Sequence, residues 1–378
     1  MNLALPFALA VRRRRLLQWA AATLVTTNGS DGGAAKGTDT GTDLAFPRDF
    51  GAHPESRVEW WYATGWLVPE NSAAEAPPSH GFQVTFFRSR TGVDAAQPSR
   101  FAARELVFAH AAVTDLAGQR LRHDQRIARS GFEIAMAATG DTAVKLRDWS
   151  MLREGDAASS RYRTRVASEA SGFGFDFALQ TTQPLLLQGV AGLSRKGPQP
   201  AQSSRYYSQP QLAVTGQLSL DGRASRVRGR AWLDHEWSDS LLDAQAVGWN
   251  WIGINLASGA ALTAFRLRRA DGSTLYAGGS HREAGGALRN FEPSEVSFTP
   301  GRTWTSAATA ATYPVQWQVA TPAGRFTVRA LLDNQELDSR QSTGAVYWEG
   351  LSELLDQRGA RVGLGYLEMT GYAGRLRI

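Results

Sequence analysis

Apolar and polar residues alternate along most of the chain after residue 43. The alternation is clearest in five segments, which are residues 80–90, 105–115, 172–180, 211–220 and 325–332. Each segment is bounded by Gly, Asp or Ser turns, as half-buried antiparallel strands are. Hardly any segment repeats with the 3.6-residue period of a helix, and residues 352–359 are no exception. The pattern predicts an all-β protein.

Many strands with little helix favour closed or nearly closed barrels, because closure removes exposed sheet edges. The 38 glycines provide for the turns and bulges that such barrels need. A chain of 378 residues exceeds the usual size of one core, so we expect two barrel domains of ordinary size. A polar, turn-rich stretch at 220–230 sets the predicted division into 44–222 and 223–378.

An acid lies among aromatic residues in the stretch VEWWYATGWL, residues 58–67. Consecutive residues of a strand point to opposite faces of the sheet. Glu59 therefore shares a face with Trp61, while Trp60 and Tyr62 share the other. If Trp61 points into a barrel, Glu59 points there too.

The same combination recurs in WLDHEW, residues 232–237. Strand parity places Asp234 and Glu236 on the face of Trp232, and His235 on the face of Trp237. The acids and the imidazole therefore face different sides unless a bulge intervenes.

Burial decides what these acids can do, because desolvation raises the pKa of a carboxyl group. A carboxyl that keeps its proton in a dry aromatic pocket is a good proton donor, and indole faces stabilise a cation. On this reading Glu59, or the pair Asp234 and Glu236, protonates an apolar alkene. The structural alternative is that Glu59 pairs with an arginine such as Arg88, and for Glu59 alone this alternative carries more weight.

Composition removes several other functions. The formal charge of +6 is modest and the basic residues are scattered, so we expect no nucleic-acid partner. Without cysteine, disulfides and thiolate chemistry are excluded. The six histidines lack the spacing of a local metal motif, so we expect no metal. No G-x-S-x-G elbow is present either.

The first 43 residues read as a signal-like segment followed by a flexible tether. Four arginines at 12–15 precede a short alanine-rich apolar run, and Arg13 to Gln18 resembles a twin-arginine export signal. Residues 28–43 are rich in Gly, Asp and Thr, as linkers are. We expect an exported protein, periplasmic or associated with a membrane.

Six stretches together resemble the AttH-type, hydroxyneurosporene synthase (carotenoid 1,2-hydratase) superfamily. They occur in the same order over nearly the whole mature chain, at residues 46–67, 185–197, 203–216, 231–239, 248–259 and 363–372. The resemblance implies two lipocalin-like β-barrel domains packed together. It also implies cofactor-free hydration of an isolated double bond in an isoprenoid, or pericyclic chemistry, and many members are described only as secreted hydrolases.

Only part of the family's site is matched by residues of this chain. A His-x-Trp pair implicated in the hydratases is matched by His235 and Trp237, whereas their Tyr-x-Asp is replaced by Phe265-Arg266-Leu267. The expected acid is therefore missing there, unless Asp234, Glu236 or Glu59 takes its role.

These observations predict a protein that binds an extended apolar molecule, an isoprenoid or a lipid, with possible association with a membrane surface. The favoured function is cofactor-free, acid-catalysed hydration or isomerisation, with a non-catalytic carrier and a secreted hydrolase as alternatives. The predicted catalytic residues are Asp234, His235, Glu236 and Glu59, with His235 as orienting or water-activating base. The predicted ligand-binding residues are Trp60, Trp61, Tyr62, Tyr206, Tyr207, Trp237, Trp249 and Trp251.

Overall fold

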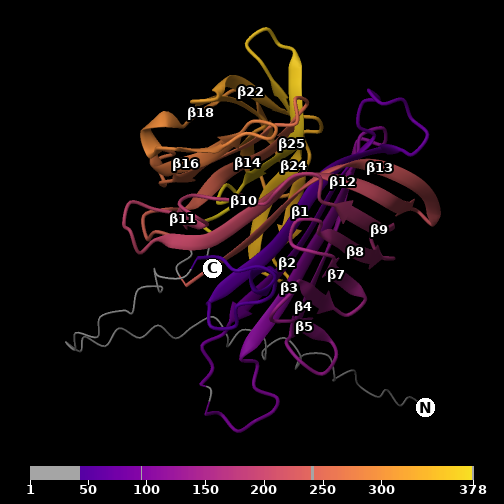
Figure 1. Ribbon diagram of the computed structural model, residues 1–378, viewed down its shortest axis with the longest axis vertical. Helices are drawn as coiled ribbons and strands as arrows, with labels where there is room; N and C mark the ends of the chain where they lie inside the picture. Colours follow the sequence, from indigo (N-terminus) through magenta and orange to yellow (C-terminus); the bar gives the residue numbers. More distant parts are fainter. Residues whose placement is uncertain (1–42, 95, 240–241, 377–378) are drawn as a thin grey trace, which may run out of the picture. The chain divides into compact units, whose positions relative to one another are not determined.

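A computed structural model describes residues 43–94, 96–239 and 242–376 (Figure 1). These residues form strands and two short 3-10 helices, η1 (Arg48–Phe50) and η2 (Pro293–Glu295), with no α-helix among them. The all-β prediction is confirmed. In this part of the chain no helix is long and apolar enough to cross a membrane. The predicted signal-like segment, and nearly all of the predicted tether, lie outside the described residues.

The first sheet is a nearly closed antiparallel barrel. Its main path runs β4-β3-β2-β1-β13-β12-β9-β8-β7-β6-β5, and β10 and β11 pair with β12. The strands are β1 (Val58–Pro69), β2 (His80–Arg90), β3 (Glu105–Asp115), β4 (Arg120–Arg129), β5 (Ala135–Ala137), β6 (Ala143–Leu146), β7 (Trp149–Glu154), β8 (Arg161–Ser168), β9 (Phe173–Gln180), β10 (Leu186–Leu187), β11 (Leu193–Arg195), β12 (Ser203–Leu220) and β13 (Arg223–Ser238).

The second sheet runs β17-β16-β15-β14-β25-β24-β22-β21-β18, and β23 pairs with β24. Its strands are β14 (Gly248–Leu256), β15 (Ala261–Arg268), β16 (Thr274–Arg282), β17 (Leu288–Phe291), β18 (Ser297–Pro300), β21 (Gln316–Thr321), β22 (Gly324–Ala330), β23 (Glu336–Ser339), β24 (Ala345–Leu355) and β25 (Arg361–Met369). A separate two-stranded ribbon joins β19 (Thr303–Thr305) to β20 (Thr312–Pro314).

Sheet membership changes after β13. The predicted division between residues 222 and 223 falls in the turn between β12 and β13, which are paired neighbours in the first sheet. The next strand, β14, begins the second sheet at Gly248. The division into folding domains stays a prediction, but the change from one sheet to the other lies between Ser238 and Gly248.

Strand parity sorts the side chains as the sequence predicts. On β1, Trp61 and Ala63 belong to the core inside the first barrel, and on β13 Leu233 does. On β14, Ile252 and Ile254 belong to the core of the second sheet. The residues between these positions face the other way, so each sheet presents a second, partly apolar face.

Those second faces pack against each other. A third apolar cluster joins Tyr62 and Trp232 of the first sheet to Trp251, Leu351 and Tyr366 of the second. The sheets approach closely enough that a Cβ added to Gly81 on β2 would lie 2.6 Å from the hydroxyl oxygen of Tyr366. At this point the two sheets are in direct contact.

Hydrogen bonds also cross this layer. His110 Nδ1 lies 2.9 Å from the Tyr347 hydroxyl, and the Thr114 hydroxyl donates to Gln335 Oε1 at 2.8 Å. Because such buried polar contacts require a fixed geometry, they set the register of one sheet on the other.

Candidate functional site

Strands β1 and β13 carry the two acid-and-tryptophan stretches, and they are neighbours. They pair antiparallel without interruption, so Trp61 lies opposite His235 and Tyr62 lies opposite Asp234. One face of this two-strand ribbon looks into the first barrel, and the other looks onto the second sheet. The predicted site residues therefore divide into two separate groups.

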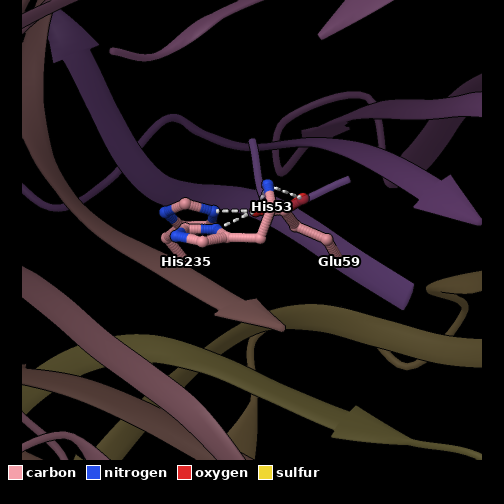
Figure 2. Close-up of side chains that lie close together, drawn as sticks. All are labelled: His53, Glu59 and His235. Atoms are coloured by element: carbon pink, nitrogen blue, oxygen red, sulfur yellow. Dashed lines mark hydrogen bonds and ion pairs between the residues drawn. The ribbon is translucent and has the colours of Figure 1, made fainter. Parts of the chain in front are cut away.

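Inside the barrel, Glu59 is fully buried and its carboxylate accepts several hydrogen bonds. Arg88 Nε donates to Oε2 at 2.9 Å. His53 Nδ1 and His235 Nε2 each lie 2.8 Å from Oε1, as Figure 2 shows. The backbone N–H of His53 donates to Oε2 at 2.9 Å.

These partners hold Glu59 in its ionised form. Burial by itself raises the pKa of the carboxyl, but hydrogen bonds from His235 and His53 outweigh it and lower the pKa to about 2. Arg88 forms the ion pair that the structural alternative anticipates. Glu59 is therefore unsuited to donate a proton at neutral pH, and any part it has in catalysis is as an anion.

His235 is enclosed in the same group. Its Nε2 faces Glu59, its Nδ1 lies 3.0 Å from the Tyr207 hydroxyl, and its ring stacks on Trp61 with centroids 4.6 Å apart. Burial lowers its pKa, which keeps the imidazole neutral. Both ring nitrogens have protein partners, and the ring faces away from Asp234. The arrangement does not leave a nitrogen to activate water beside that acid, although a catalytic role for His235 remains a prediction.

The barrel group extends outward through further ion pairs. His53 Nε2 lies 3.2 Å from Asp49 Oδ1, and Asp49 accepts from Arg48 at 2.6 Å. On the other side, Arg88 Nη1 donates to Glu105 at 2.9 Å. Trp237 covers His53 with parallel rings 3.7 Å apart. The group is a charge network under aromatic cover.

On the opposite face of β13, Asp234 is buried beside neutral donors only. Its Oδ1 accepts from the Ser208 hydroxyl at 2.5 Å and from Trp232 Nε1 at 2.7 Å. Desolvation is the largest influence, and it raises the pKa of Asp234 to about 7 despite these hydrogen bonds. Asp234 is therefore an acid that still holds much of its proton near neutral pH.

The second sheet supplies two more acids to this layer. Glu349 on β24 and Glu368 on β25 lie directly opposite each other in the strand register. Like charges in directly opposed positions are destabilising, so the pair favours keeping a proton. Burial and the neighbouring acids raise the pKa of Glu368 to about 7, and they raise that of Glu349 well above its usual value. Trp249 Nε1 donates to Glu368 Oε2 at 2.9 Å.

Glu236 is the fourth acid of the layer, and it is an ion-pair partner. Lys196 Nζ lies 3.0 Å from its Oε1, and the Ser204 hydroxyl donates to the same oxygen. The ammonium group also lies 4.3 Å from the ring centroid of Tyr206 and 4.9 Å from that of Phe265. Lys196 thus neutralises Glu236, one of the predicted proton donors. Hereafter the interface carboxyls are Asp234, Glu349 and Glu368.

Two buried polar atoms beside the interface carboxyls have no hydrogen-bond partner among the described residues. They are the Tyr62 hydroxyl and Glu349 Oε1. Glu368, Trp249 and Trp60 remain partly accessible to solvent. Water therefore reaches one edge of the layer. The Tyr62 hydroxyl and the Glu349 carboxyl interact with each other electrostatically.

The predicted ligand-binding residues follow the same division. The barrel interior holds Trp61, Tyr207 and Trp237. The layer between the sheets holds Trp60, Tyr62, Trp249 and Trp251, and Tyr206 lies beside Lys196 and Asp234. A surface hollow of about 640 Å³ lies over β8, β9 and the turn after β12, and none of these residues lines it. A ligand pocket at the predicted residues stays a prediction.

Sequence reasoning missed His53, Asp49, Glu349 and Glu368 as site residues. For the two glutamates a signal was present, because Glu349 directly follows Trp348 and Glu368 lies two residues after Tyr366. Both repeat the pairing of an acid with aromatic residues that singles out Glu59. His53 and Asp49 carry no comparable signal, since they precede the first strand.

The fold and the two acid groups define a class: an all-β protein of two packed antiparallel sheets with buried carboxyl groups on both faces of its central ribbon. Residues 38–372 match the AttH-like family model. The chain belongs to the AttH-like family. No match was found among the curated proteins.

Several solved structures are similar to this chain, and two of them follow in order of identity. A putative AttH protein from Nitrosomonas europaea is 48% identical, covering 88% of this chain and 98% of that one, with a TM-score of 0.80. Kievitone hydratase from Nectria haematococca is 16% identical, covering 89% and 95%, with a TM-score of 0.64. At that identity the likeness to the hydratase shows a common fold only.

Proposed function

We propose that this protein adds water to, or isomerises, a carbon–carbon double bond of an extended apolar molecule by acid catalysis without a cofactor. The observation that carries the proposal is the set of interface carboxyls. Asp234 and Glu368 lie in a layer of aromatic side chains, and the pKa of each is raised to about 7. A general acid works best when its pKa lies near the working pH.

The proposed reaction needs only protons and water. A carboxyl O–H gives its proton to one alkene carbon, and the π electron pair becomes the new C–H bond. The other carbon becomes a cation, which a water oxygen attacks. The water then returns a proton to a carboxylate, so that the net change is the addition of one water. Loss of a proton from the neighbouring carbon instead gives an isomer.

The surroundings suit a cationic intermediate. Trp251 and Tyr62 pack edge to face with centroids 5.5 Å apart, and Trp232 lies beside them. Aromatic faces attract cations, more strongly where water is excluded. A carboxylate that has given up its proton is also a counter-charge for the cation.

Glu368 is the best replacement for the acid that the family resemblance leads one to expect. The matching position is Leu267 on β15, and Phe265 lies two residues earlier on the same face. Phe265 lies opposite Trp251 on β14, and Trp251 lies opposite Glu368 on β25. Glu368 is therefore in the row of Phe265, two strands or about 10 Å away, and one step of the same face along from the row of Leu267 and Trp249.

The test uses delipidated full-length protein incubated with unsaturated isoprenoids and acyl lipids in water enriched in heavy oxygen and deuterium. We expect heavy oxygen in the product for hydration, or deuterium alone for isomerisation. Asp234→Asn and Glu368→Gln should lower the rate by about 10²-fold or more while ligand affinity stays near that of the unmodified protein.

Glu353→Gln is the matched control. Glu353 is a buried acid on β24, and Arg329 Nε donates to its Oε1 at 2.8 Å. The Glu353→Gln variant should convert substrate at the rate of the unmodified protein. Tight binding of a lipid with no label incorporated would instead establish the non-catalytic carrier. If Asp234→Asn and Glu368→Gln both still incorporate label, that result would contradict the assignment of the proton donor.

A further inference from the structure

We propose that His53, Glu59 and His235 form a binding site for one divalent first-row transition-metal ion inside the first barrel. Each residue offers one ligand atom, and the three atoms lie within 4.8 Å of one another (Figure 2). Two imidazoles with one carboxylate are a donor set that binds Zn²⁺ and its neighbours in the first row. The site is separate from the interface carboxyls and does not depend on the proposed function.

The distances fit an ion among these atoms. Glu59 Oε1 lies 2.8 Å from His53 Nδ1 and 2.8 Å from His235 Nε2. Two ligand atoms held about 2.1 Å from one ion in a tetrahedral arrangement are about 3.4 Å apart, a little more than the separations found here. The side chains therefore need only small adjustments to change from hydrogen bonding with each other to ligating an ion.

Each ligand also has a partner that fixes its orientation. The second nitrogen of His53 faces Asp49 Oδ1 at 3.2 Å, and that of His235 faces the Tyr207 hydroxyl at 3.0 Å. Ligating histidines commonly donate their other N–H to a carboxylate or another oxygen in this way. With the proton of each imidazole on that outer nitrogen, the inner lone pairs point at the space beside Glu59 Oε1.

The charge around the group favours a cation. Three carboxylates, those of Asp49, Glu59 and Glu105, are joined by hydrogen bonds to two guanidinium groups, those of Arg48 and Arg88. When both imidazoles are neutral, the network therefore carries one net negative charge. Arg88 contacts Oε2 of Glu59 and leaves Oε1 to the histidines.

No sequence motif marks this site, because its ligands come from separate places in the chain. His53 lies in the loop before β1, Glu59 lies on β1, and His235 lies on β13. The pairing of β1 with β13 brings the last two together, and the short turn after η1 folds His53 over them. Only the tertiary structure makes a ligand set of them.

The experiment is equilibrium dialysis of chelator-treated, full-length protein against Zn²⁺ and, separately, Co²⁺. We expect one ion per chain, a Co²⁺ visible absorption spectrum of nitrogen and oxygen ligation, and a higher Tm with the ion bound. His53→Ala and Glu59→Gln should lose this binding. Asp49→Asn should weaken it by about 10- to 100-fold, as loss of an orienting partner does elsewhere.

His281→Ala is the matched control, because His281 is a partly buried histidine on β16 outside this group. The His281→Ala variant should bind Zn²⁺ and Co²⁺ as the unmodified protein does. Absence of stoichiometric binding to the unmodified protein would overturn the proposal without relying on any variant. Binding that survives in folded His53→Ala, or that disappears in His281→Ala, would also overturn it.

Discussion

Glu59 and Asp234 lie on neighbouring strands, are almost equally buried, and differ greatly in acidity. Glu59 has a guanidinium and two imidazoles for partners, and its pKa is lowered to about 2. Asp234 has a hydroxyl and an indole N–H, and its pKa is raised to about 7. Burial disfavours the charge on both. Partners of opposite charge decide the outcome, so an acid beside tryptophan in a sequence does not by itself identify a proton donor.

The largest effect should come from removing the charge partner of Glu59. Arg88→Met leaves a buried carboxylate without its guanidinium, and we expect the free energy of unfolding to fall by about 3 to 5 kcal/mol. Urea denaturation measures this fall in the free energy of unfolding. The double variant Glu59→Gln with Arg88→Met should be less destabilised than the sum of the single variants. A loss below about 1 kcal/mol in Arg88→Met would mean that the ion pair does not hold Glu59 in place.

The interface carboxyls should make the protein less stable as the pH rises. In the unfolded chain Asp234 and Glu368 ionise near pH 4, whereas in the folded protein they keep their protons until about pH 7. The contribution of these two carboxyls to the free energy of unfolding is fully present below their pKa in the unfolded chain. It is lost as the pH rises from about 4 to about 7, by about 1.4 kcal/mol per pH unit and group.

Denaturant titrations across that range should show a shallower slope in Asp234→Asn and in Glu368→Gln. Glu59→Gln serves as control between about pH 5.5 and 7. With a pKa of about 2 in the folded protein and an ordinary pKa in the unfolded chain, Glu59 is ionised in both states there and cannot alter the slope. Equal slopes in all three variants and the unmodified protein would contradict the difference between the two regions.

A smaller effect should follow the loss of one hydrogen bond. Trp249→Phe removes the indole donor to Glu368 and should raise the pKa of that carboxyl further, with about 1 kcal/mol of stability lost. Carbon-detected NMR titration of labelled glutamate measures the shift. Trp66→Phe is the control on the same inter-sheet surface. An unchanged or lower pKa in Trp249→Phe would show that the indole does not stabilise the carboxylate.

Much of the fold followed from local pattern. Alternation predicted the strands, and parity alone predicted that His235 faces away from Asp234. That Glu59 lies on the face of His235 follows only from the register of β1 on β13. What decides the chemistry was not local. Arg88, 29 residues from Glu59, was named from the sequence only as an example of a partner. The cross-strand pair Glu349 and Glu368 forms only when β24 and β25 align. Acidity depends on such neighbours, which a single sequence does not bring together.

The central claim is that the interface carboxyls keep their protons while Glu59 does not. Carbon-detected NMR of protein labelled at the Asp and Glu carboxyl carbons tests it directly, with signals assigned through Asp234→Asn, Glu368→Gln and Glu59→Gln. At about pH 5.5, above the usual pKa of a carboxyl, we predict protonated signals for Asp234 and Glu368 and an ionised signal for Glu59. Ionised signals for all three at that pH would contradict the account.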